Sequence, residues 1–338
     1  MKLLLVLAPL LIGCSGVSLP QPGRVVNCDD AEVHEAAIAA VQHVNDHHKH
    51  GYKYALNRVE NVNVHSLASG EIYILELDLL ETKCPSLSPT PLELCAVRPV
   101  IEQAVEADCD FKIQKQSGIF TVVGAQCKSE LDSAENIRRI CPNCPFLAPM
   151  NDTQVVHAAD VSLHKFNGGN STAFYLLHEI GRGSIQSGIS NSVHIEFVIA
   201  ASNCTKDDAN SGLFACVEET GDSAHYGACS GSVVKNQGAI DEDVVVQCTV
   251  YEPQPRKVAQ AGAPQIPLAS PQTNGFQSRF HHNLRFSNLG PHSSESNSAE
   301  HHLLAAHTKQ IVKRSLTGEP VPPNVPTLPL CPGRKIHF

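Results

Sequence analysis

The sequence predicts an α+β fold in which one disulfide-containing unit occurs twice. The first observation behind this prediction is a repeat of cysteine spacings in two quartets: Cys84, Cys95, Cys109 and Cys127, then Cys204, Cys216, Cys229 and Cys248. The gaps hold 10, 13 and 17 residues in the first quartet and 11, 12 and 18 in the second. The second observation is that a helical pattern and then strand-like runs accompany each quartet. One helix wrapped by four antiparallel strands in each copy accounts for both observations.

Each copy begins with a pattern typical of an amphipathic helix. Apolar residues recur at spacings of four and three in both copies: Val33, Ala37, Val41 and Val44, then Val155, Ala159, Leu163 and Phe166. This spacing lines one face of a helix. Asp29 or Asp30 is placed to cap the first helix, and Asn151-Asp152 precedes the second.

Alternating, strand-like runs follow each helix. They lie at 52–64, 72–80, 105–113 and 119–127 in the first copy and include 193–199 and 244–251 in the second. Alternation of apolar and polar residues is typical of strands with one buried face. With 5% aromatic residues and no Trp, the cores are expected to be modest, so disulfides should supply part of the stability.

Both ends of the chain differ in composition from the two copies. Lys2, the apolar stretch 3–12 and the small residues that follow predict a secretory signal peptide. From Pro253 onward Pro, Gly, Gln, Ser and His dominate, which predicts disorder. The expected organisation is a signal peptide at 1–18, a first domain at 19–133, a link and second domain at 134–252, and a disordered tail at 253–338 tethered by Cys331.

Charge and motif content exclude several classes of function. The formal net charge of -9 argues against nucleic acid and anionic membranes as partners and is compatible with cations. No stretch after the signal reaches the ~20 apolar residues that a membrane span needs. No Ser/His/Asp order, phosphate-binding loop or HExxH motif is present, so we expect neither an enzyme nor a cofactor. Scattered pairs among the 18 histidines predict no dedicated metal site.

Short segments along the chain carry a family resemblance: NCDD at 27–30, DLLET at 78–82, PTP at 89–91, DCDF at 108–111, LAPMNDT at 147–153, VVHAA at 155–159 and CPGR at 331–334. They resemble the fetuin family, whose members carry two cystatin domains in tandem. The resemblance runs nearly end to end. It implies a secreted plasma glycoprotein that binds calcium phosphate clusters and inhibits ectopic mineralisation, with calcium as a ligand in the form of calcium phosphate.

The resemblance also implies a disulfide pairing, which spacing alone leaves open among many connectivities. The implied pairs are Cys28–Cys331, Cys84–Cys95, Cys109–Cys127, Cys141–Cys144, Cys204–Cys216 and Cys229–Cys248.

Acidic residues of the first copy alternate with apolar ones along two of its strands. Tyr73, Leu75, Leu77 and Leu79 share the parity that must face the core, as do Val105, Ala107, Phe111 and Ile113. Five carboxylates share the outward parity: Glu76, Asp78, Glu106, Asp108 and Asp110. If the two strands are neighbours, these carboxylates form one exposed face with ~6.6–6.8 Å between successive residues of a strand. Calcium takes oxygen ligands, so the face is a candidate for mineral binding, and an ordinary solvated sheet face is the alternative.

The second copy provides an internal comparison for this face. Its corresponding outward positions include His194, Glu196, Val198, Ser223 and His225. The fold therefore does not require acids there. Ile74 occupies a position at which the family resemblance implies a carboxylate, which predicts a weaker face.

The segment Cys141-Pro142-Asn143-Cys144-Pro145 supports an alternative function. One branch of the fetuin family, and related venom inhibitors, use a similar segment to plug the cleft of astacin-type metalloproteinases. There an Asp between the cysteines meets the zinc, whereas Asn143 is a neutral and poorer ligand. The other interpretation is a local disulfide that stiffens the link. Inhibition of cysteine proteases is not expected, because the loop at 66–70 keeps only the glycine of the cystatin Gln-x-Val-x-Gly motif.

The sequence also contains signals for covalent modification. Asn151, Asn170 and Asn203 lie in N-glycosylation acceptor motifs, although Cys204 inside the third motif disfavours its use. Ser133, Ser293 and Ser298 have the Ser-x-Glu form that kinases of the secretory pathway prefer. Each phosphate would add about -1.5 to -2 charges and strong oxygen acceptors, which favours calcium binding.

Overall fold

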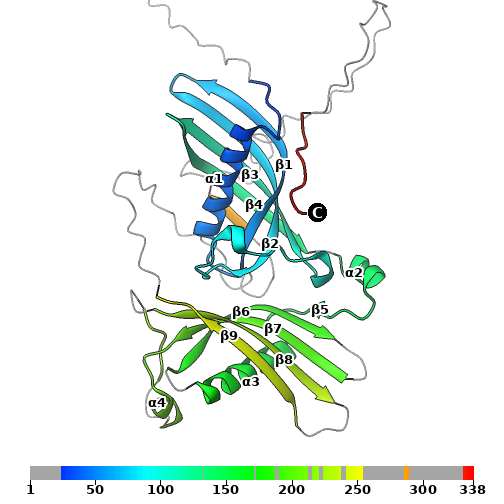
Figure 1. Cartoon of the computed structure of the whole chain (residues 1–338), viewed down its shortest axis with the longest axis vertical. Helices are drawn as coiled ribbons and strands as arrows, with labels where there is room; N and C mark the ends of the chain where they lie inside the picture. Colours follow the sequence, from blue (N-terminus) through cyan, green and yellow to red (C-terminus); the bar gives the residue numbers. More distant parts are fainter. Residues whose placement is uncertain are drawn as a thin grey trace, which may run out of the picture.

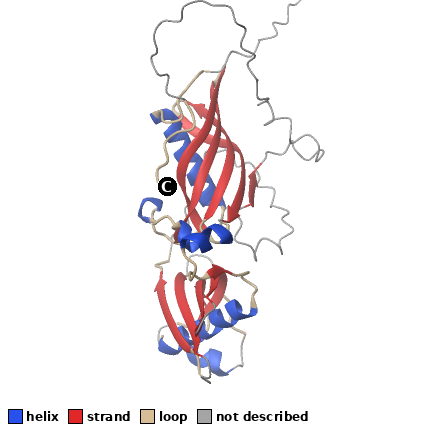
Figure 2. Cartoon of the chain, turned by 90° about the vertical axis from the view of Figure 1, so that its right-hand side faces the viewer, coloured by secondary structure: helices blue, strands red, loops and turns tan. Residues whose placement is uncertain are grey.

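The computed structural model describes residues 24–338 except 132, 171–172, 187–189, 212–214, 221–223, 237–240, 254–284 and 289–329. The predicted signal peptide, most of the predicted tail, Ser293 and Ser298 therefore lie outside the described residues. The described residues form two domains, each with one antiparallel sheet and a helix across it, stacked end to end (Figure 1; Figure 2).

Domain 1 is a five-stranded sheet in the order β1-β2-β3-β4-β10 with helix α1 across one face. Its elements are α1 (Ala31–His47), β1 (Tyr52–Leu67), β2 (Gly70–Pro85), η1 (Leu92–Leu94), η2 (Val100–Glu102), β3 (Val105–Gln116), β4 (Ile119–Leu131) and β10 (Arg285–Asn288). The four strands predicted for the first copy are all present.

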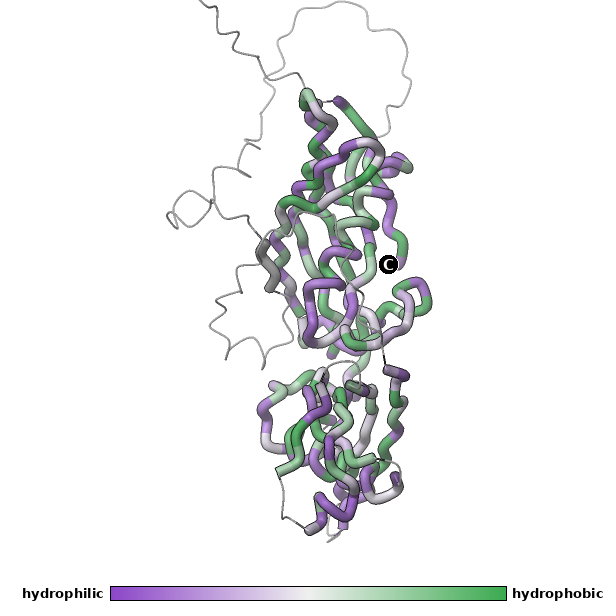
Figure 3. The backbone as a smooth tube through the Cα atoms, turned by 90° about the vertical axis from the view of Figure 1, so that its left-hand side faces the viewer, coloured by the Kyte–Doolittle hydropathy of each residue, from purple (hydrophilic) through white to green (hydrophobic). Residues whose placement is uncertain are grey.

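Domain 2 repeats this plan in the order β5-β6-β7-β8-β9. A short helix, α2 (Ala134–Ile140), leads into β5 (Phe146–Leu147), α3 (Thr153–Gly169), β6 (Tyr175–Gln186), β7 (Ser190–Ala201), α4 (Lys206–Ser211), β8 (Tyr226–Asn236) and β9 (Asp243–Val250). Hydrophilic and hydrophobic residues alternate along many of the strands, as the colours of Figure 3 show. Within the described part of the chain, no helix has the length and apolar character that crossing a membrane requires.

The core of each domain lies between its helix and its sheet. The predicted apolar stripe of α1 is buried in full: Val33, Ala37, Val41 and Val44. In α3, Val155 and Ala159 are buried, and Leu163 and Phe166 pack partly buried against the same core. The caps differ. Asp152 caps α3 by accepting from the Gln154 N–H at 2.8 Å, whereas the Asp30 side chain accepts from the Asn27 N–H and does not cap α1.

Six disulfides are present among the described residues, and they are the pairs that the family resemblance implies: Cys28–Cys331, Cys84–Cys95, Cys109–Cys127, Cys141–Cys144, Cys204–Cys216 and Cys229–Cys248. Two of them join directly opposite residues of neighbouring strands, β3 to β4 and β8 to β9. Each disulfide therefore fixes the register of its strand pair, and the two strand pairs occupy corresponding places in the two domains.

The predicted tail over 253–338 is tethered by Cys331 as expected, but two of its segments are placed against domain 1 rather than disordered. Arg285–Asn288 forms β10, which pairs with β4. Residues 330–338 run beside β1 (red in Figure 1). There the Gly333 N–H donates to the Val59 carbonyl at 2.9 Å and the Ile336 N–H donates to the Asn57 carbonyl at 2.8 Å. These segments are placed because they satisfy backbone groups at both edges of the sheet, and because Cys331 is bonded to Cys28.

Candidate functional site

The outer face of the domain 1 sheet brings the five predicted carboxylates together. In the pairing of β2 with β3, Glu76 lies opposite Asp110, Asp78 lies opposite Asp108, and Glu106 lies opposite Leu80. Directly opposite residues in antiparallel strands have Cβ atoms ~4.5–5.5 Å apart. We call these five residues, Glu76, Asp78, Glu106, Asp108 and Asp110, the acidic face.

The strand parity that places the acidic face outward is the one the sequence predicts, with one exception. Glu76, Glu106 and Asp108 are exposed, while Asp78 and Asp110 are partly covered. The apolar residues of opposite parity, among them Leu77 and Phe111, are buried in the core. The exception is Leu80, which has outward parity and is buried. Its neighbours Glu81 and Thr82 are buried as well, so both faces of β2 are covered at this end.

The structure adds two carboxylates that the sequence analysis missed. Glu130 lies on β4 directly opposite Glu106, and its parity along β4 is the signal that would have found it. Glu60 lies on β1, and its negative charge helps to raise the pKa of Asp108. A register shift between Val59 and Asn61 interrupts the alternation of β1, so alternation does not predict which way Glu60 faces. Basic residues border the face on both sides, since Arg58 lies opposite Asp78 and Lys128 lies opposite Asp108.

Burial and the crowding of like charges both change the acidity of this face. Burial, together with the charges of Asp78, Glu130 and Glu60, raises the pKa of Asp108 above its ordinary value. Burial and the charge of Asp108 raise the pKa of Asp110 in the same direction. Like charges directly opposite each other destabilise a sheet. A bound cation would relieve that repulsion.

Asp78 is also held by a buried amide. The Asn57 side chain is 1% exposed and donates from Nδ2 to Asp78 Oδ2 at 2.8 Å. The same Nδ2 donates to the Phe338 carbonyl at 3.2 Å, and Asn57 Oδ1 accepts from the His337 N–H at 3.2 Å. Asn57 therefore connects the acidic face to the segment 330–338.

The corresponding face of domain 2 carries no such array among the described residues. His194 contacts Ser192, Glu196 is engaged at the domain junction, and Val198 is buried. His225 pairs with Glu219 at 3.5 Å, and Ser223 lies outside the described residues. Within the part of the chain that the structure describes, no group of three or more His, Cys, Asp or Glu side chains is arranged to hold a single metal ion.

The link between the domains presents Asn143 to solvent. The disulfide Cys141–Cys144 closes a loop of one turn around Asn143, whose side chain is exposed. Gln186 Nε2 of β6 donates to the Asn143 carbonyl at 2.8 Å. The guanidinium of Arg138 lies 4.8 Å from the centroid of the Phe146 ring. These contacts anchor the backbone of the loop to domain 2 and leave its side chains outside.

A network of ion pairs joins the two domains beside this link. Arg98 of domain 1 is 1% exposed and donates from Nε to Glu81 Oε1 at 2.8 Å and from Nη2 to Glu196 Oε2 of β7 at 2.8 Å. Arg182 of β6 reaches back across the junction to Glu81 Oε1 at 3.0 Å and to the Gln103 carbonyl at 2.7 Å. Burial pushes the pKa of Glu196 up, but the hydrogen bonds and charge of Arg98 outweigh it and lower that pKa. Charged groups of both domains thus neutralise one another at the junction.

The comparison with known proteins decides the family. A model of the cystatin domain matches residues 23–118. The chain is 38% identical to alpha-2-HS-glycoprotein of Sus scrofa over 344 residues, which cover 92% of each chain. It is 36% identical to alpha-2-HS-glycoprotein of Homo sapiens over 93% of this chain and 92% of that one. The chain belongs to the alpha-2-HS-glycoprotein (fetuin-A) family.

Solved structures give the same fold from a second branch of the fetuins. Mouse fetuin-B in complex with crayfish astacin matches with a TM-score of 0.58 and 26% identity, over 70% of this chain and 76% of that one. Mouse fetuin-B in an inhibitory complex with human meprin beta matches with a TM-score of 0.60 and 27% identity, over 69% and 76%. The predicted architecture of two tandem cystatin-like domains is confirmed.

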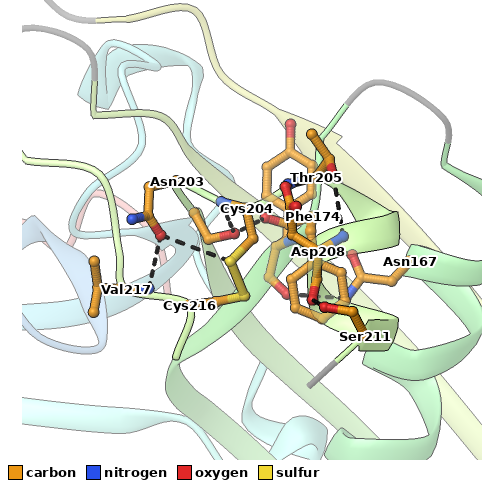
Figure 4. Close-up of a disulfide and its surroundings, with 11 residues drawn as sticks. Asn167, Phe174, Asn203, Cys204, Thr205, Asp208, Ser211, Cys216 and Val217 are labelled. Atoms are coloured by element: carbon orange, nitrogen blue, oxygen red, sulfur yellow. Dashed lines mark hydrogen bonds between the residues drawn. A yellow bond between two sulfur atoms is a disulfide. The ribbon is translucent and has the colours of Figure 1, made fainter. Parts of the chain in front are cut away.

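The three asparagines of the predicted N-glycosylation motifs belong to domain 2. Asn151 and Asn203 are exposed, and Asn170 ends α3 with its side chain partly covered. Next to the disulfide Cys204–Cys216, Asn203 Oδ1 accepts from the Val217 N–H at 3.0 Å (Figure 4). Attachment of a glycan uses the amide nitrogen, so this bond is compatible with it. Thr205 immediately precedes α4 and exchanges hydrogen bonds with Asp208.

Proposed function

We propose that the chain is a secreted, non-catalytic glycoprotein that binds calcium phosphate clusters through the acidic face and delays their precipitation. The observation that carries this proposal is the register of β2 and β3, which sets Glu76 against Asp110 and Asp78 against Asp108. The chain repeats the fold in domain 2 without repeating these pairs, so the fold alone does not account for them.

The chemistry of the face suits an extended mineral surface better than a single ion. Calcium takes six to eight oxygen ligands, and a flat array does not enclose one ion. The same array meets several calcium ions of a cluster at once, each with one or two carboxylates. Every contact also relieves repulsion between opposite carboxylates, which favours the bound state. The proposed partners are calcium phosphate clusters, and the proposed setting is extracellular, in plasma.

Phosphorylation would extend the same chemistry. Ser133 is exposed and precedes α2 in a Ser-x-Glu motif, and the other two candidate serines, Ser293 and Ser298, lie outside the described residues. A phosphate at Ser133 would add about -1.5 to -2 charges near the end of β4.

The test is the lag time of calcium phosphate precipitation with the full chain present, measured beside inhibition of an astacin-type protease by the same sample. We expect a longer lag than with an unrelated acidic protein of equal net charge. A lag that does not differ from this control would remove the mineral-binding proposal.

A second candidate function is inhibition of astacin-type metalloproteinases through the loop 141–145. It is favoured by the exposed side chain of Asn143 in a disulfide-closed loop and by the fetuin-B complexes with astacin and meprin beta. A protease zinc site keeps one position open for an oxygen ligand. The neutral amide of Asn143 is a weaker ligand for that position than a carboxylate.

Asn143→Asp is therefore expected to strengthen inhibition of an astacin-type protease, measured as a lower inhibition constant. The matched control is Asn191→Asp, which adds the same charge at an exposed residue of β7. Equal inhibition by all three proteins would exclude Asn143 as a zinc ligand. Potent inhibition by the unaltered chain would make this the primary function.

A further inference from the structure

We propose that a basic hollow beside the acidic face binds the phosphate ions of calcium phosphate. This inference rests on the proposed function: the acidic face would bind the calcium ions of the mineral, and the hollow would bind its phosphate ions. The hollow has a volume of about 220 Å³ and lies where the segment 330–338 packs against α1 and β1. Its polar lining comes from Asp29, His34, Arg58, Arg334 and Lys335.

The basic residues of the hollow come from distant parts of the chain. Arg58 belongs to β1, while Arg334 and Lys335 follow Cys331, which is bonded to Cys28 across a sequence separation of 303. Gly333 fits tightly at this point, because a Cβ there would lie 2.9 Å from Asp29 Oδ1. The disulfide and this close approach bring Arg334 and Lys335 beside Arg58.

The charges of the hollow leave donors for an anion. Arg334 Nε pairs with Asp29 Oδ2 at 3.3 Å, and Arg58 uses Nε and Nη2 to contact Glu60. A guanidinium has five N–H donors, so each arginine keeps further donors for a tetrahedral oxyanion. Lys335 forms no ion pair with the residues that the structure describes. Among the residues that line the hollow, Arg58, Arg334 and Lys335 are basic and Asp29 is acidic, so the lining carries a net positive charge in a chain whose formal net charge is -9.

The position of the hollow suits a mineral that contains both ions. Arg58 lies directly opposite Asp78, so the hollow and the acidic face share one edge. Asn57, the residue before Arg58, donates to Asp78 and to the Phe338 carbonyl. A calcium ion on Asp78 and a phosphate at Arg58 would therefore be neighbours, as they are in the solid. A volume of about 220 Å³ accommodates a phosphate with several waters, each of which occupies ≈ 30 Å³ in the liquid.

The test is the binding of inorganic phosphate to the full chain in calcium-free buffer, followed by ³¹P line broadening and by calorimetry. The double variant Arg334→Gln/Lys335→Gln should weaken phosphate binding roughly fivefold or more, the size expected for removing two exposed ion pairs. The matched control Arg139→Gln/Lys235→Gln removes two exposed positive charges elsewhere and should leave binding unchanged.

Two outcomes would overturn the inference: no phosphate binding by the unaltered chain, or equal weakening by both double variants. The acidic-face variant described in the Discussion separates this inference from the proposed function. If the hollow binds phosphate, that variant should retain phosphate binding even though it no longer delays precipitation. Loss of phosphate binding in the acidic-face variant would also contradict a separate site.

Discussion

Replacing Arg98 with alanine is expected to lower the free energy of unfolding by about 3–5 kcal/mol and to loosen the domain junction. Arg98 is almost fully buried and contacts Glu81, Glu102 and Glu196. Its removal leaves Glu81 buried with Arg182 as its remaining partner and leaves Glu196 without the guanidinium that bridges the domains. Removing one partner from a buried ion pair costs far more than the pair contributes relative to apolar residues.

Denaturant unfolding, followed separately for the two domains, measures this effect. A two-domain chain need not unfold in one step, so each transition is compared on its own. Arg139→Ala is the control, because Arg139 forms an exposed pair with Glu135 and its removal should change stability by less than about 0.5 kcal/mol. If Arg98→Ala and Arg139→Ala gave the same small change, the junction would not depend on the buried network. Hydrogen exchange at β6 and β7 should accelerate only in the Arg98 variant.

Much of the fold follows from local patterns in the sequence. The helices are predicted because their apolar residues recur at helical spacing, and the domain 1 strands because their residues alternate. Two strands of domain 2, β6 and β8, were not located because glycines interrupt their pattern. The structure gives a reason for these glycines. A Cβ at Gly183 would lie 2.5 Å from Val155 Cγ1, and one at Gly231 would lie 2.7 Å from Ser162 Oγ, so α3 packs directly on the sheet.

For the candidate site, the sequence predicts which side of a strand each residue faces but not which residues lie opposite one another. Parity places Asp78 and Asp108 outward, but only the register of β2 and β3 shows that they face each other. The hollow was not predictable, because Arg58 and Lys335 line it together only through packing of the segment 330–338, which composition assigns to disorder. The network around Arg98 was missed for a related reason: its members, Glu81, Arg98, Arg182 and Glu196, are far apart in sequence and form no motif.

Changing all five residues of the acidic face to Gln or Asn is expected to abolish most of the delay of calcium phosphate precipitation while keeping the fold. The variant carries Glu76→Gln, Asp78→Asn, Glu106→Gln, Asp108→Asn and Asp110→Asn. Amides keep the shape of the carboxylates but lose the charge that attracts calcium. The fold should persist because Asn at position 78 keeps a side-chain oxygen that can accept from Asn57 Nδ2, and because substitutions on an outer sheet face usually shift stability by less than about 0.5 kcal/mol each.

The pKa shifts give the sign of the stability change. The folded-state pKa values of Asp108 and Asp110 lie above their ordinary values, so folding disfavours their charged forms. Their charges therefore lower stability as the pH rises from the unfolded-state pKa to the folded-state pKa, and this loss persists at neutral pH. The amide variant removes it. Its thermal midpoint at neutral pH should equal or exceed that of the unaltered chain, and the difference should shrink on acidification.

A control of equal charge separates the acidic face from bulk electrostatics. It replaces five exposed carboxylates of domain 2 by amides: Asp160, Asp207, Asp241, Asp243 and Glu252. Both variants change the formal net charge by the same amount, but only one changes the opposed pairs of β2 and β3. If charge alone delayed precipitation, both variants would lose the delay equally. If the acidic-face variant kept the full delay, mineral binding would have to lie outside the domain 1 sheet. If only the acidic-face variant lost the delay, the delay would depend on how the carboxylates are arranged, because the two variants differ in that feature and have the same net charge.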